Sequence, residues 1–111
     1  KLNDLEQAVA TYIDIACNKL RKQNSVARYI TVHIRSSYFS KTQEYVSTTK
    51  TAALPIASSY TPTFISHGIS LLRSIYKPGV AYAKAGVYLT DITSATTIQQ
   101  HQKFLSHIEV L

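Results

Sequence analysis

Hydrophobic and polar residues alternate most regularly between Arg28 and Ser37, where Ile30, Val32 and Ile34 fall on one side of the pattern. A period of two is typical of a strand with one face in a core and the other in solvent. The stretch is rich in β-branched residues and lacks Gly and Pro, which favours a strand further. The opposite face of this predicted strand would carry Tyr29, Thr31, His33, Arg35 and Ser37.

The same alternation predicts strands at 45–56 and 81–92. In the second strand, Ala52, Leu54 and Ile56 share the apolar face, and Lys50 falls in phase with them. We therefore expect Lys50 near the end of the sheet, where its aliphatic stem can lie on apolar surface. The opposite face of the second strand carries Ser47, Thr49 and Thr51. The third strand alternates between Ala83, Ala85, Val87 and Leu89 on one face and Tyr82, Lys84, Gly86, Tyr88 and Thr90 on the other.

Apolar residues at spacings of three and four predict two amphipathic helices. The first spans 3–22, with Asn3 as N-cap and Glu6 completing a capping box. The second begins at Thr61 as N-cap with Pro62 in the first helical position, and Pro78-Gly79 stops it. Gly68 lies within the second apolar stripe, which indicates close packing against a neighbour. Cys17 lies within the first stripe and is interpreted as a core residue.

The predicted order is α-β-β-α-β, with polar connectors at 23–27 and 38–44. Neighbouring strands joined by a short loop pair antiparallel by default. We therefore predict an α+β fold in which two helices pack on one face of a small, mostly antiparallel sheet, leaving the other face polar. The domain would span 1–92 and be followed by a tail, 93–111, in which 99–111 could form a short helix.

Charge and composition favour some classes of partner and cellular location over others. The chain has 111 residues, and twelve Lys and Arg oppose six Asp and Glu, giving a formal charge of +6. This balance favours a polyanionic partner, most often nucleic acid, although a basic surface can also serve only solubility. No apolar run reaches the roughly 20 residues of a membrane span, and no signal peptide is recognised. A single cysteine fits a cytoplasmic setting, and the absence of Met suggests a fragment of a longer protein.

Catalytic chemistry is not indicated. The six acids are scattered and form no pair suited to two-metal or acid–base work, the four histidines make no metal-ligand motif, and no Gly-rich phosphate loop is present. We therefore expect no catalysis and no cofactor in this fragment. The acids are Asp4, Glu6, Asp14, Glu44, Asp91 and Glu109, and the histidines are His33, His67, His101 and His107.

The polar sheet face is the candidate site. Short hydroxyl side chains, a glycine and a few cations suit close passage of a sugar-phosphate backbone, and nothing on the face resembles a code for base edges. The alternative is a solvated face that packs on another domain. The predicted DNA contacts are Thr31, His33, Arg35, Ser37, Lys41, Thr49, Lys50, Thr51, Lys84, Gly86, Tyr88 and Thr90.

Three stretches resemble a known family. Residues 27–40 (ARYITVHIRSSYFS), 53–55 (ALP) and 84–91 (KAGVYLTD) resemble the C-terminal little-finger domain of Y-family translesion DNA polymerases of the bacterial UmuC type, the catalytic subunit of error-prone DNA polymerase V and its plasmid relatives. The resemblance runs from about Leu5 to Ile92.

The resemblance implies a two-helix, four-stranded domain whose open sheet face lies against template–primer duplex, across the major groove, during SOS and DNA-damage tolerance. It implies a parent polymerase, a Mg²⁺-dependent enzyme whose catalytic carboxylates lie outside this chain, in the bacterial cytoplasm at the nucleoid, with accessory subunits as partners. The family domain begins with a strand ahead of the first helix, which this chain lacks. We therefore expect an exposed sheet edge that could pair with a second copy.

A clamp-binding motif often follows this domain in the family, and Gln100, Phe104 and Leu105 are the matching candidates for sliding-clamp contact. Lys103 departs from the motif, and a tail helix covering the core is the alternative. Two further functions stay open for the whole chain. One is a protein-interaction module that docks a polymerase core or clamp. The other is an RNA-binding fold, for which only Tyr29 and Tyr88 offer stacking surfaces.

Overall fold

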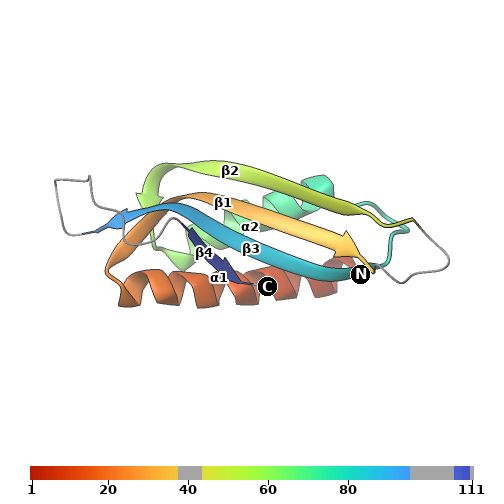
Figure 1. Ribbon diagram of the computed structural model, residues 1–111, viewed down its shortest axis with the longest axis horizontal. Coiled ribbons are helices and arrows are strands. Elements are labelled where there is room, and N and C mark those ends of the chain that lie inside the picture. The colour runs from red at the N-terminus through yellow and green to blue at the C-terminus, as the bar shows by residue number, and fades with distance from the viewer. Residues whose placement is uncertain (38–43, 96–106, 111) are drawn as a thin grey trace.

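The computed structural model describes residues 1–37, 44–95 and 107–110. The sheet has the order β2-β1-β3-β4, and every neighbouring pair is antiparallel. Both helices pack on one face of this sheet, so the predicted α+β arrangement is confirmed (Figure 1). In chain order the elements are α1 (Leu2–Lys22), β1 (Ser25–Ser36), β2 (Ser47–Ser58), α2 (Thr61–Ile75), β3 (Tyr82–Ser94) and β4 (His107–Val110).

β1 is the central strand and keeps the predicted alternation. Ile30, Val32 and Ile34 are fully buried against the helices, while the residues between them stay partly exposed. The strand begins at Ser25, within the stretch predicted as a connector, because Ser25 and Ala27 pair with Ser94 and Ile92 of β3. The polar composition of 23–27 hid this extension, which depends on a partner distant in sequence.

β2 departs from its predicted pattern at its C-terminal end. Leu54 is 1 % exposed, but Ile56, predicted on the same buried face, is 79 % exposed. The register explains the difference. Ala27 pairs with Ser58 and Tyr29 pairs with Ala53, so β2 advances five residues while β1 advances two. The extra residues form a bulge, which breaks the alternation after Leu54.

The helix starts also differ from prediction. The N-cap of α1 is Lys1, and neither helix has a side-chain cap hydrogen bond, so Asn3 and Thr61 are not caps. Glu6 accepts a hydrogen bond from Arg73 Nε at 2.7 Å instead of reaching back to the helix start. A tertiary partner has therefore replaced the predicted local capping box.

Gly68 allows the two helices to approach, as predicted. A Cβ at this position would lie 2.5 Å from Ile13 Cδ1 of α1 and 3.3 Å from Ile30 Cδ1 of β1. The first contact is shorter than packed carbon atoms tolerate, and the second is tight. The absence of a side chain at Gly68 thus allows α2 to lie this close to α1 and the sheet.

The described end of the tail is a strand, and the helix predicted for 99–111 is wrong there. His107–Val110 forms β4, which pairs with Val87–Thr90 at the edge of β3. Strand pairing over this sequence separation depends on the rest of the fold, so local spacing does not reveal it. The clamp-binding candidates Gln100, Phe104 and Leu105 lie outside the described residues.

Candidate nucleic-acid interface

Four cross-strand rows form the open face of the sheet. Directly opposite residues of neighbouring antiparallel strands share a face, so the register identifies the members of each row. In the order β2, β1, β3 the rows are Ser47, Arg35 and Lys84; Thr49, His33 and Gly86; Thr51, Thr31 and Tyr88; and Ala53, Tyr29 and Thr90.

These rows bring together nine of the twelve predicted DNA contacts. The remaining three are Ser37, Lys41 and Lys50. Ser37 follows the last residue of β1, and Lys41 is outside the described residues. Lys50 pairs with Val32, which is buried under the helices. Lys50 therefore lies on the helix side of the sheet, at its edge, and does not join the open face. Antiparallel pairing of β1 with β2 and β3 therefore brings most of the predicted contacts onto one face of the sheet.

Hydrogen bonds between side chains tie β1 to β2 on this face. Thr31 Oγ1 and Thr51 Oγ1 are 2.6 Å apart, and His33 Nε2 lies 2.9 Å from Ser47 Oγ. Cross-strand pairs of this kind stabilise a sheet modestly and fix the positions of their side chains. The face is therefore an ordered surface of short polar groups.

A hollow of about 150 Å³ lies at the basic end of the open face. It is lined by His33, Arg35, Lys84, Ala85 and Tyr88. Gly86, the partner of His33 on β3, has no side chain, so this position of the open face is bare backbone.

Two cationic residues, one on β1 and one on β3, line this hollow. Arg35 and Lys84 are direct cross-strand partners, and Arg35 also donates a hydrogen bond to the carbonyl oxygen of Ser36 at 3.0 Å. Like charges directly opposite each other destabilise a sheet. Both side chains line the hollow, so this end of the open face is basic.

The register adds two neighbours that sequence reasoning missed. β4 places Glu109 beside Tyr88 and His107 beside Thr90, on the far side of β3 from β1. The local sequence pattern does not predict these two neighbours, because β4 joins the sheet by pairing with a strand distant in sequence.

Among the described residues, no three His, Cys, Asp or Glu side chains gather as metal ligands. Cys17 is buried in the core. Burial raises the pKa of its thiol, although a hydrogen bond with the side chain of Thr61 acts in the opposite direction. None of the described helices is long and apolar enough to cross a membrane.

The fold and the open face define a small α+β domain with two helices on one side of a four-stranded antiparallel sheet and a polar, basic surface on the other. The chain belongs to the impB/mucB/samB family, since the model of the C-terminal domain of that family matches residues 1–102.

Three curated relatives illustrate the similarity. Protein MucB of Salmonella typhimurium is 35% identical over 92 residues, which cover 83% of this chain and 22% of that protein. Protein ImpB of the same species is 30% identical over 95 residues, covering 86% and 22%. Protein UmuC of Salmonella typhimurium strain LT2 is 28% identical over 96 residues, covering 86% and 23%. The chain therefore spans between a fifth and a quarter of the length of these relatives.

Proposed function

We propose that this domain binds the sugar-phosphate backbone of duplex DNA with the open face of its sheet. The observation that carries the proposal is the Arg35–Lys84 pair, two cations held opposite each other at the end of a face built from short polar side chains. An excess of six positive charges over the whole chain supports the same partner.

The composition of the face favours contact with phosphates over reading of bases. Thr31, Thr49 and Thr51 offer short hydroxyls, which can approach a backbone closely and hydrogen-bond to phosphate oxygens. Discrimination between base pairs commonly uses long bidentate side chains that reach into a groove. The rows of the face hold one arginine and no Asn or Gln, so we expect binding to depend little on DNA sequence.

Family membership suggests the setting in which such binding would act. In this proposal the parent protein is a translesion DNA polymerase of the DNA-damage response, and this domain positions template–primer duplex beside its catalytic core. The carboxylates that hold Mg²⁺ would then belong to other parts of the parent protein. This chain would contribute DNA affinity and processivity, and no catalytic group.

A salt titration of duplex binding tests the proposal. Fluorescence anisotropy with unrelated duplex sequences should give similar affinities, and each neutralised phosphate should add about −0.9 to the slope of log K against log salt. Arg35→Ala and Lys84→Ala should each weaken binding equally for all sequences. Lys19→Ala is the matched control, because Lys19 is an exposed cation in the last turn of α1, on the helix side.

Failure of this test has a clear meaning. If the domain binds duplex no better than serum albumin does at low salt, the open face is not a DNA surface. The protein-interaction module would then be the better description of this chain.

A further inference from the structure

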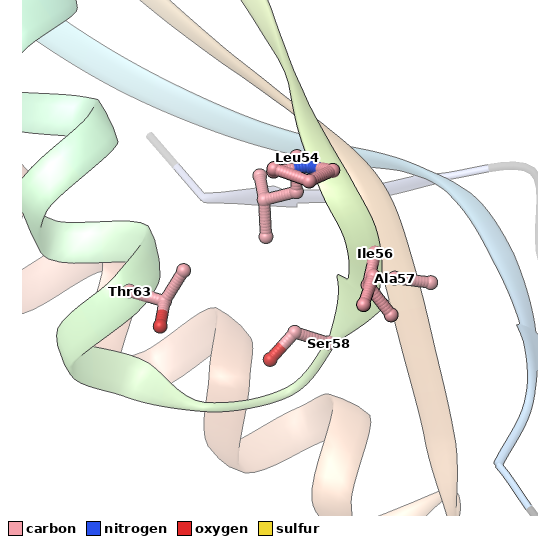
Figure 2. Close-up of a pocket in the computed structure, with 6 residues that line it drawn as sticks. Leu54, Ile56, Ala57, Ser58 and Thr63 are labelled. Carbon is pink, nitrogen blue, oxygen red and sulfur yellow. The ribbon is translucent and has the colours of Figure 1, made fainter.

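The end of β2 and the start of α2 form a second exposed feature, which DNA binding does not use. We call residues 54–63 the β2–α2 corner. It contains a pocket of about 320 Å³ lined by Leu54, Pro55, Ile56, Ala57, Ser58 and Thr63. Figure 2 shows the side chains of Leu54, Ser58 and Thr63 directed into the space between the strand and the helix.

The corner displays large apolar side chains to solvent. Ile56 is 79 % exposed and Tyr60 is 64 % exposed, while Leu54 forms a buried apolar floor. Single exposed apolar residues are ordinary, but here Ile56 lines a pocket together with the buried Leu54. This combination could accept one apolar side chain from a partner.

Two arginines hold the corner in place. Arg28 donates a hydrogen bond to the carbonyl oxygen of Leu54. Arg21 donates to the carbonyl oxygen of Ser59 at 2.7 Å and to Thr61 Oγ1 at 2.9 Å. The corner is therefore fixed from α1 and from β1, so a partner would meet a surface that is already formed, which lowers the entropic cost of binding.

The charge around the corner is positive. No residue lining the pocket is charged, and both charged residues bonded to the corner are arginines. The partners of Arg21 are a carbonyl, a hydroxyl and the amide oxygen of Asn18, so within the described residues no carboxylate neutralises it. Lys50 adds a third cation on the helix side of β2, four residues before Leu54.

β2 is also an edge strand, and in the described part of the chain no strand pairs with its outer side. An extended segment could add to this edge by main-chain hydrogen bonds and place alternate side chains over the helix side. Lys50 and Leu54 lie on that side about 13 Å apart, at roughly 3.3 Å per residue.

From these observations we infer that the β2–α2 corner docks an extended, acidic peptide segment of a partner protein. One apolar side chain of the peptide enters the pocket. An Asp or Glu four residues from it along the peptide pairs with Lys50, and further acids face Arg21 and Arg28. This surface is separate from the open face of the sheet, so the inference does not depend on DNA binding.

Selection from a phage-displayed library of random peptides on the purified 111-residue chain tests the inference. Enriched peptides should share an apolar residue and an acidic residue four positions apart. A synthetic consensus peptide, labelled with fluorescein, should lose affinity by about tenfold for Ile56→Ser, because the variant lacks the aliphatic side chain that the bound peptide would cover. Lys50→Glu should weaken the same peptide by a comparable factor and reduce the salt dependence of its binding.

Two matched variants serve as controls. Ile15→Ser changes another exposed isoleucine, 41 % exposed on α1, and Lys77→Glu reverses a cation beyond the opposite end of α2. Both should bind the peptide as the unchanged chain does, and thermal unfolding of all four variants should confirm that they are folded.

Three results would overturn the inference. The first is a selection without a shared apolar–acidic pattern. The second is a consensus peptide that binds the Ile56→Ser and Lys50→Glu variants unweakened. The third is concentration-dependent dimerisation of the chain that Ile56→Ser abolishes, which would identify a second copy as the occupant of the corner.

Discussion

Replacing Lys84 by glutamate should stabilise the domain while destroying its proposed DNA affinity. Lys84 is exposed and lies directly opposite Arg35 on the neighbouring strand. The substitution converts a like-charge cross-strand pair into an opposite-charge pair. Cross-strand pairs of opposite charge contribute about 0.2–1 kcal/mol, and directly opposed like charges are unfavourable. Because Lys84 is exposed, we expect a net gain near the middle of this range, about 0.5 kcal/mol.

Urea unfolding followed by circular dichroism measures this gain, and anisotropy measures duplex binding of the same samples. A stabilisation of about 0.5 kcal/mol corresponds to roughly 2–4 °C in midpoint temperature for a domain of this size. The gain should shrink at high salt, since the Debye length falls from about 10 Å at 0.1 M to about 3 Å at 1 M.

Lys77→Glu is the matched control, because it lowers the net charge equally at an exposed lysine that faces no cation in the described registers. That variant should gain no stability, since a cation just beyond the end of α2 favours the helix. Equal stability changes in the two variants, or a loss of stability in Lys84→Glu, would refute the reasoning that the Arg35–Lys84 repulsion is maintained for ligand binding.

Three further predictions concern the core. Leu54→Ala should cost about 2–5 kcal/mol in urea unfolding, whereas Ile56→Ala should cost less than about 0.5 kcal/mol; equal costs would contradict the bulged register of β2. Gly68→Val should cost about 3 kcal/mol or more, because its side chain would enter the space held by Ile13, and a neutral result would contradict the close helix contact. Burial raises the pKa of the Cys17 thiol, so the folded state favours the neutral form. The Cys17 contribution to stability should therefore be intact below the ordinary thiol pKa and fall as pH rises from there through the raised folded pKa; a Cys17→Ala variant with the same alkaline decline would contradict this.

The parts of the fold that follow from local pattern were predictable. Ile30, Val32 and Ile34 alternate with polar residues, and that period alone places them in a half-buried strand. Gly68 within an apolar stripe likewise indicates close packing, because a glycine in a helix interior costs about 1 kcal/mol relative to Ala and a close neighbour is a reason to keep it.

Other parts depend on partners distant in sequence. The phase of Ile56 in β2 matched Leu54, but the bulge opposite Ala27 and Tyr29 turned it outward. Glu6 had the right spacing for a capping box, yet Arg73 of α2 binds it. β4 pairs with β3 across the intervening chain, which no local spacing reveals.

The candidate site was largely predictable because the face of each strand follows from its alternation. Lys50 is the predicted contact that the structure places on the other face of the sheet. Its phase with the apolar residues was visible in the sequence, and the structure places it on the helix side as that phase requires. The charge of Lys50 favours a place among the DNA contacts, but charge does not distinguish the two faces of a sheet.

The salt dependence of duplex binding by the unchanged chain and by Arg35→Ala tests the central proposal most directly. If the open face neutralises phosphates, the slope of log K against log salt should become shallower by about 0.9 for each contact that Arg35 supplies, equally for unrelated sequences. An unchanged slope and affinity in Arg35→Ala, with the Lys19→Ala control behaving in the same way, would contradict it.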